Sequence, residues 1–203
     1  MSYLQALKNL KPQLVIATGP AGTGKTMNAC KQAVNHLRES TVKKVIITRP
    51  TNTIDDESHG YLPGTLDKKM EPWMIPIYDY FNEDLGTRTT NRYIESGLIE
   101  ICPLGYMRGR TFKNTYIIAD EMQNSSKNQM KTLLTRLDDE SKLVITGDLD
   151  QKDTIYDGLD DLLKRLPDNV NESDYVFLQQ YNIDDVKRSE FVKYILSLYN
   201  LRV

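Results

Sequence analysis

The sequence predicts an α/β fold, with a mostly parallel sheet covered by helices on both faces. Short apolar runs alternate along the chain with segments in which apolar residues recur at helical spacing. Polar and glycine-rich residues follow several of these runs, and the carboxyl ends of parallel strands are where such sheets bind ligands. The length of 203 residues suits one substantial domain and leaves little room for two.

The apolar runs are the predicted strands. They are short enough for buried parallel strands, and the first two end at a glycine turn and before Pro50. The predicted strands cover residues 13–18, 43–48, 98–102, 116–120, 142–146 and 175–178.

Three segments are predicted to be helices that pack on this sheet. In residues 25–39, Met27, Cys30, Val34 and Leu37 share one face, so Cys30 is expected to be a core residue. A second helix begins at Ser126, with Gln129 at the spacing of a capping box and an apolar stripe behind it. A third covers about residues 185–201 near the C-terminus.

The stretch between about residues 51 and 97 is less regular than the rest. It contains Pro63, Gly64, Pro72 and Pro76 among several aromatic residues. Because proline breaks a helix interior, we expect short helices interrupted at positions 72 and 76. We interpret this stretch as an insertion within a single domain that covers residues 1–203.

Composition excludes several classes of protein. The net charge of −2 is unlike that of a protein that coats nucleic acid constitutively, although it leaves room for a local basic groove. No apolar run reaches the roughly 20 residues of a membrane span. The N-terminus lacks a secretion signal, and Cys30 and Cys102 form no CxxC pair. We therefore expect a cytoplasmic protein.

One motif predicts a nucleotide site directly. GPAGTGKT follows the first strand and opens the first helix, which is the context required of a phosphate-binding loop. Backbone N–H groups of such a loop surround the β-phosphate, assisted by the helix N-terminus. Lys25 is expected to reach the β- and γ-phosphates of ATP, and the Thr26 hydroxyl to coordinate Mg²⁺. The predicted loop comprises Gly19, Pro20, Ala21, Gly22, Thr23, Gly24, Lys25 and Thr26.

Two further strand ends carry candidate catalytic groups. Asp120 is placed to hold Mg²⁺, and Glu121 is a candidate general base that orients the attacking water. After the strand at 142–146, the sequence Gly-Asp-x-x-Gln places Gln151 where an amide senses the γ-phosphate or positions the water.

Beyond these motifs, the chain resembles the PhoH family, P-loop ATPases related to superfamily 1 helicases. The resemblance runs from about residue 13 to residue 200, and its LPG and MRGRT stretches are more specific than the phosphate loop. The matching pieces are GPAGTGKT at 19–26, ITRP at 47–50, GYLPGTLDKKMEPWMIPIYD at 60–79, IEICPLGYMRGRTF at 99–112, IIADEMQN at 117–124, ITGDLDQKD at 145–153 and DVKRSEFV at 185–192.

The resemblance implies a single RecA-like core that hydrolyses ATP, with RNA or single-stranded nucleic-acid binding or helicase action. It matches Arg188 to the family's C-terminal arginine, and Arg49 to a helicase motif that touches the nucleic-acid backbone. Relatives of this size also occur in bacteriophage genomes. If this chain is phage-encoded, the expected location is the host cytoplasm. The chain departs from superfamily 1 in two ways. Gln5 is the nearest candidate for the glutamine that recognises adenine, and one RecA-like domain stands where helicases have two.

This second departure favours an oligomer. An arginine placed on the transferring phosphoryl group raises the rate of phosphoryl transfer about 10³- to 10⁵-fold, and it is often supplied in trans. Arg108, Arg110 and Arg188 are the candidates, and we expect a ring of identical subunits such as a hexamer. Arg108 and Arg110 also lie in the most basic stretch, among aromatic residues suited to single strands of RNA or DNA. We expect Arg110→Ala to weaken RNA binding with little change in stability.

Two other functions fit the motifs. A nucleoside kinase also combines a phosphate loop with an Asp-Glu-x-Gln strand end, but such kinases usually carry zinc-binding cysteines or a clear acceptor lid. A binding module that ATP switches without turnover is the other alternative, and it has less need of a base such as Glu121.

Overall fold

In this computed structural model, the structure describes residues 1–50, 66–187 and 189–200. Six strands form one sheet, in which every neighbouring pair is parallel. The predicted α/β fold is therefore confirmed, and each predicted strand is present within two residues of its expected bounds. In spatial order the strands are β3 (Ile99–Ile101), β2 (Lys44–Thr48), β4 (Thr115–Ala119), β5 (Lys142–Gly147), β1 (Leu14–Thr18) and β6 (Val176–Gln180).

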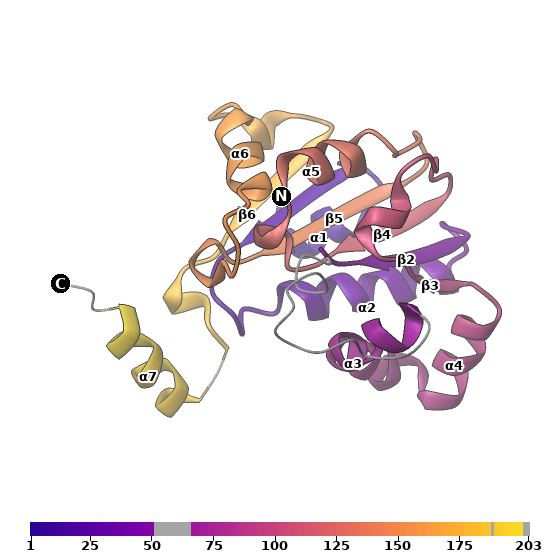
Figure 1. Cartoon of the computed structure of the whole chain (residues 1–203), viewed down its shortest axis with the longest axis horizontal. Coiled ribbons are helices and arrows are strands. Elements are labelled where there is room, and N and C mark those ends of the chain that lie inside the picture. Colours follow the sequence, from indigo (N-terminus) through magenta and orange to yellow (C-terminus); the bar gives the residue numbers. More distant parts are fainter. Residues whose placement is uncertain (51–65, 188, 201–203) are drawn as a thin grey trace.

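Helices cover both faces of the sheet (Figure 1). On one face lie α2 (Lys25–Arg38), α3 (Leu66–Leu85) and α4 (Thr87–Glu95), and on the other α5 (Lys127–Leu134) and α6 (Gly158–Arg165). Alternate residues of one strand point to opposite layers, as the period of a β-strand requires. In β1, Val15 packs in the core beneath α2 and α3, while Ile16 packs in the core beneath α5 and α6.

The register of the sheet brings the predicted motifs to one edge. Thr18 of β1 pairs with Gly147 of β5, and Thr48 of β2 pairs with Ala119 of β4. The phosphate loop, Arg49, Asp120 and Asp148 each follow directly on one of these strand ends. Four stretches of chain that are far apart in sequence thus meet at the carboxyl edge, as expected for this class of sheet.

The expectation that prolines divide the insertion is wrong for its second half. Helix α3 is continuous through Pro72 and Pro76, although a proline in a helix interior costs about 3 kcal/mol. Met74, Ile77 and Phe81 share its buried face and are at most 1% exposed. Burying three large apolar side chains stabilises by an amount comparable to the cost of the two prolines, so tertiary packing decides this helix. Residues 51–65, with Pro63, Gly64 and His59, lie outside the described residues.

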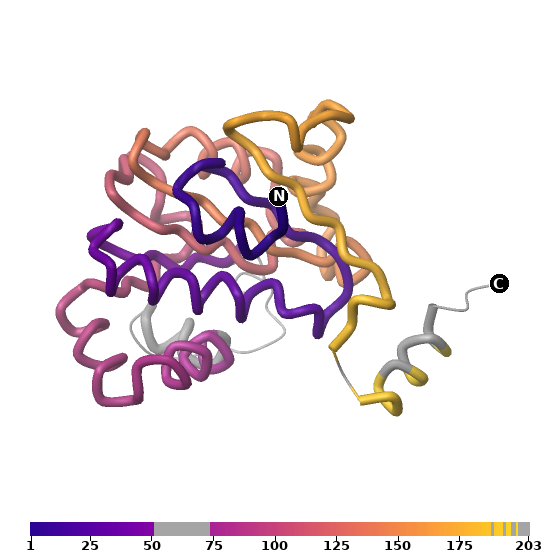
Figure 2. Tube along the Cα trace, turned by 180° about the vertical axis from the view of Figure 1, so that it is seen from behind, coloured from indigo at the N-terminus to yellow at the C-terminus, as the bar shows by residue number. Residues whose placement is uncertain are grey.

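Several elements were not predicted. Helix α1 (Tyr3–Lys8) lies beside β6 at the sheet edge seen from behind (Figure 2), and its capping box joins Ser2 to Gln5. Helix α6 was also missed. Helix α7 (Glu190–Asn200) begins later than the predicted residue 185 and extends away from the sheet in both views (Figures 1 and 2). Among the described residues, no helix is both long and apolar enough to cross a membrane.

Candidate nucleotide-binding site

The predicted phosphate loop has the backbone geometry that its glycines allow. Gly24 adopts the left-handed conformation (φ 83°, ψ 17°) immediately before α2 begins at Lys25. At Gly19, φ is +122°, and a Cβ atom would lie 2.2 Å from the backbone oxygen of Tyr181. Only glycine fits there, because the loop runs against the segment that follows β6. The Thr23 hydroxyl donates to the Pro20 carbonyl at 3.1 Å and closes the loop.

Lys25 lies inside this loop. Its Nζ donates to the carbonyl oxygens of Gly19 (2.5 Å) and Pro20 (2.8 Å). Burial lowers the pKa of the Lys25 ammonium, and the carboxylates of Asp148 and Glu121 oppose this shift. The ammonium is thus held at the N-terminus of α2, the end of a helix that attracts phosphate.

Asp120 is the most connected carboxylate at the strand ends. It is 2% exposed. Its Oδ1 accepts from the hydroxyls of Thr26 (2.7 Å) and Thr146 (2.5 Å), and its Oδ2 accepts from the Arg49 guanidinium, with Nε at 2.9 Å. The carboxylate therefore joins the phosphate loop to β2, β4 and β5.

This oxygen-rich corner fits Mg²⁺. The ion prefers oxygen ligands, uses only one or two protein groups and takes the rest from phosphate and water. The Thr26 hydroxyl and the Asp120 carboxylate, 2.7 Å apart, are such a pair. They would hold the ion beside the phosphates bound by Lys25.

Glu121 has an unusual backbone conformation for a residue other than glycine. Its φ and ψ are 56° and 36°, in the left-handed region, where strain is common at functional sites. The carboxylate Oε2 accepts from Nε2 of Gln123 at 2.6 Å. Burial, and then the charge of Asp120, raises the pKa of Glu121 above its ordinary value.

The loop after β5 completes the site. Asp148 is buried, and burial raises the pKa of its carboxyl. Gln151 ends the 3-10 turn η4 (Leu149–Gln151), and its backbone oxygen accepts from Gln123 at 3.4 Å. Gln123 was not among the predicted site residues. The signal was present, because it is the last residue of the strand-end sequence Asp-Glu-Met-Gln.

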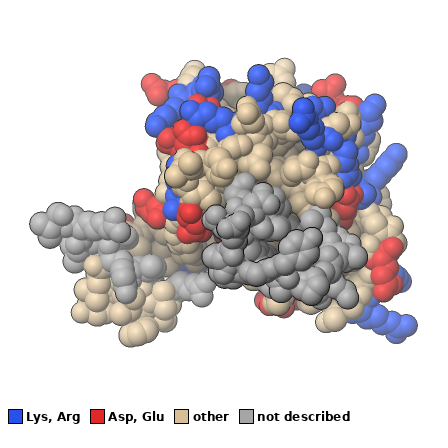
Figure 3. All heavy atoms as spheres, viewed as in Figure 1, with Lys and Arg blue, Asp and Glu red and all other residues tan. Residues whose placement is uncertain are grey.

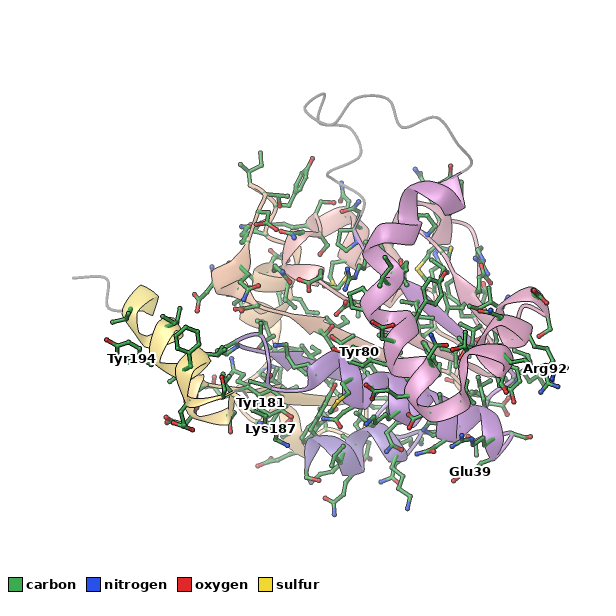
Figure 4. The ribbon with its side chains drawn as sticks, turned by 90° about the horizontal axis from the view of Figure 1, so that it is seen from below. Glu39, Tyr80, Arg92, Tyr181, Lys187 and Tyr194 are labelled. Atoms are coloured by element: carbon green, nitrogen blue, oxygen red, sulfur yellow. The ribbon has the colours of Figure 1, made fainter. Side chains whose placement is uncertain are left out.

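One cavity of about 630 Å³ connects these groups. Its wall also includes Pro76, Ile77 and Tyr80 from α3, and Lys187 from the segment after β6. The backbone N–H of Lys187 donates to the Gly22 carbonyl at 3.0 Å. Figure 4 shows Lys187 and Tyr181 together on the α7 side, with Tyr80 on α3 nearer the centre. The cavity lies in the size range of small-molecule and cofactor sites. The predicted site residues that line it are Ala21, Gly22, Gly24, Lys25, Thr26, Arg49, Asp120, Glu121 and Gln151.

The predicted arginines do not all lie in this cavity. Arg49 lies in the cavity against Asp120, and the nucleic-acid contact predicted for it stays a prediction. Arg110 forms a bidentate ion pair with Glu100 (2.6 and 3.0 Å), outside the cavity. Arg108 is exposed at the end of the 3-10 turn η2 (Leu104–Met107). Arg188 lies outside the described residues. Gln5 is not among the residues that line the cavity and belongs to the capping box of α1, and a role for it in adenine recognition stays a prediction.

Comparison with known proteins agrees with this geometry. The model of a family described as PhoH-like protein matches residues 1–200. The chain belongs to the PhoH family. It is 41% identical over 198 residues to a PhoH-like protein of Bacillus subtilis, covering 98% of this chain and 61% of the relative. It is 36% identical over 205 residues to protein PhoH of Escherichia coli, covering 98% and 56%.

A PhoH-like protein of Mycobacterium tuberculosis is 38% identical over 186 residues, covering 92% of this chain and 52% of the relative. The chain thus spans between about half and three fifths of the length of these relatives. The PhoH family has a P-loop ATPase-like core, and the phosphate loop, Asp120 and the loop after β5 lie within the matched residues.

Proposed function

We propose that this PhoH-family protein hydrolyses ATP and couples hydrolysis to the binding or remodelling of single-stranded nucleic acid. One observation carries the first part. Lys25 and Thr26 from the phosphate loop, and Asp120 and Glu121 from the end of β4, line a single cavity at the carboxyl edge of the sheet. An anion-binding loop, a metal-binding carboxylate and a candidate base are the parts that phosphoryl transfer needs.

The proposed mechanism assigns one task to each group. Backbone N–H groups of the loop and the Lys25 ammonium bind the β- and γ-phosphates. Bound Mg²⁺, held through Thr26 and Asp120, would supply charge neutralisation on those phosphates. Glu121 accepts a hydrogen bond from the attacking water and orients it, and Gln151 lines the same cavity. Arg49 holds the Asp120 carboxylate in place through Oδ2.

Support for a nucleic-acid partner comes from the helicase-like sequence resemblance and from surface charge. Arg108 and Lys113 are exposed in the same stretch of chain as the exposed Tyr106, a combination of residue types that suits phosphates and stacked bases. Figure 3 shows Lys and Arg side chains along the upper rim of one face, near α5 and α6. Acidic side chains are interspersed with them, in keeping with the overall charge of −2. The rim favours a limited contact with a single strand rather than an extended coat.

The test is phosphate release from ATP and Mg²⁺, with and without single-stranded RNA or DNA, beside Lys25→Ala prepared identically. We expect turnover in the wild type, stimulation by one of the nucleic acids, and loss of turnover in Lys25→Ala. Wild-type turnover equal to that of Lys25→Ala would refute the ATPase. Transfer to added nucleosides would then support a kinase, and ATP binding alone would support a nucleotide-switched module.

A further inference from the structure

The side chain of Gln123 joins two of the loops that build the proposed site. It projects from η3 (Met122–Asn124), directly after β4, and is 2% exposed. Its Nε2 donates to Glu121 Oε2 at 2.6 Å and to the Gln151 carbonyl at 3.4 Å. Its Oε1 accepts the backbone N–H of Asp148 at 3.1 Å. A single amide therefore contacts the candidate base and both ends of the Asp148–Gln151 turn.

Packing holds this amide in place. A Cβ atom on Gly147 would lie 2.9 Å from Gln123 Oε1 and 2.6 Å from Leu159 Cδ2. The end of β5 thus approaches Gln123 so closely that a side chain at position 147 has no room. The contact fixes the distance between the loop after β4 and the loop after β5.

Glu121 needs such a partner because its carboxylate must point at a water molecule. The residue has a left-handed backbone (φ 56°), and its side chain has several rotatable bonds. The short bond from Gln123 restricts those bonds. Gln123 itself is not among the residues that line the cavity, so it acts on a bound nucleotide through Glu121 and the Asp148–Gln151 turn.

We propose that Gln123 is a positioning residue, which orients the Glu121 carboxylate and links it to the loop after β5, so that the two loops respond to nucleotide as one unit. The inference rests on the proposed ATPase function. It predicts that a defect at Gln123 lowers the rate of hydrolysis and leaves nucleotide affinity unchanged, because small displacements of a catalytic group lower the rate by up to about 100-fold.

Two substitutions separate the hydrogen bonds from the packing. Gln123→Met retains the volume and removes both hydrogen-bonding atoms, and we expect kcat to fall about 10- to 100-fold with KM within about 3-fold of wild type. Gln123→Glu retains an acceptor for the Asp148 N–H but sets a carboxylate against Glu121, so its kcat should fall at least as far. Gln129→Met, which disrupts the capping box of α5 six residues away, is the matched control and should retain wild-type kcat.

A double-mutant comparison tests whether the effect passes through Glu121. In a Glu121→Gln background, Gln123→Met should lower kcat by less than about 2-fold, because residues that act as one unit are not additive. Hydrogen exchange at the Asp148 amide, which needs no turnover, should be faster in Gln123→Met than in wild type. Wild-type kcat in a folded Gln123→Met, an additive effect in the Glu121→Gln background, or unchanged exchange would overturn the inference. If the wild-type protein shows no ATP turnover but the Asp148 amide still exchanges faster in Gln123→Met, the ATPase proposal fails and the structural link through Gln123 stands.

Discussion

The strictest structural constraint on a single residue is at Gly19. Its positive φ and the approach of the Tyr181 carbonyl both exclude a side chain. We expect Gly19→Ala to lower the free energy of unfolding by about 2 kcal/mol or more and to abolish ATP binding, because the loop must shift to relieve the contact. Urea denaturation and titration with a fluorescent ATP analogue measure the two effects.

Gly105 offers a matched control, since it has no positive φ, and a Cβ atom added there would meet no other atom within 4 Å. Gly105→Ala should change stability by less than about 1 kcal/mol and leave nucleotide binding intact. A Gly19→Ala protein that binds ATP like wild type would show that the loop has more freedom than this contact allows.

A second residue-level prediction concerns Arg110, whose ion pair with Glu100 gives reason to revise an expectation from the sequence. Arg110 and Lys44 hold the pKa of Glu100 at about 2. Because this value lies below the unfolded pKa of about 4.3, the pair stabilises the fold above that pH, and the stabilisation is lost as pH falls toward 2. Arg110→Ala should therefore lower stability at pH 7 by about 1 kcal/mol after allowance for solvent screening, and flatten the loss of stability as pH falls from about 4 toward 2.

Urea midpoints from pH 2 to pH 7 measure this effect, with the exposed Arg108→Ala as the control. An equal acid slope in wild type and Arg110→Ala would contradict the ion-pair explanation. The sequence allowed either a solvated face or a salt bridge for Arg110, but spacing alone did not identify Glu100 of β3 as its partner. A contribution of Arg110 to RNA binding stays a prediction.

Among the elements, β5 and the link between α1 and β1 are joined by a buried lysine. Lys142 is fully buried, and its Nζ donates to the carbonyls of Asn9 (2.8 Å) and Pro12 (2.5 Å). Burial lowers the pKa of Lys142 to about 7. Because the unfolded pKa is about 10.4, the unfolded chain binds more protons between these values, so stability from this group rises with pH from 7 upward.

We expect wild-type stability to increase by about 1 kcal/mol per pH unit between pH 7 and 9, as measured by urea unfolding. Lys142→Met should lose this dependence and also some stability at every pH, because two buried carbonyls lose their donor. The exposed Lys131→Met is the control and should retain the wild-type slope. The same slope in Lys142→Met would assign the titration to another group.

The elements that sequence predicted well are those with a strong local pattern. The strands are apolar and short, and Ser126 and Gln129 do form the predicted capping box. The failures have tertiary causes. Helix α3 continues through two prolines because Met74, Ile77 and Phe81 are buried by contacts far along the chain. Strand-end spacing predicted which segments reach the cavity. The role of Gln123 could not be predicted in this way, because it depends on how the loops after β4 and β5 face each other.

At the scale of the whole molecule, the proposed ATPase raises the question of which arginine stabilises the charge on a nucleotide bound to its P-loop core. The described residues of this core place Arg49 in the cavity, where it already binds Asp120. Arg110 is paired with Glu100, so Arg108 and Arg188 are the stronger candidates for an arginine supplied in trans. The proposed ring would bring one of them to the cavity of a neighbouring subunit, where it would stabilise the transferring phosphoryl group.

Complementation between inactive subunits tests this arrangement. Lys25→Ala removes a group that each subunit supplies to its own nucleotide, and Arg188→Ala or Arg108→Ala removes the proposed donation to a neighbour. In an equimolar ring with random mixing, about one quarter of the interfaces would combine an intact phosphate loop with an intact arginine. We expect phosphate release from the mixture to reach about that fraction of the wild-type rate, while each variant alone stays inactive.

The matched control is a mixture of Lys25→Ala with Glu121→Gln. Both residues line the same cavity of one chain, so no mixture of these two variants restores a site, and activity should stay absent. Light scattering in ATP and Mg²⁺ gives the size of the assembly under the same conditions. Restoration by an arginine variant but not by Glu121→Gln would establish donation in trans and identify the arginine. A monomer in ATP and Mg²⁺, or equal results from both mixtures, would instead require each subunit to hydrolyse ATP with its own residues, and Arg49 would become the arginine to test.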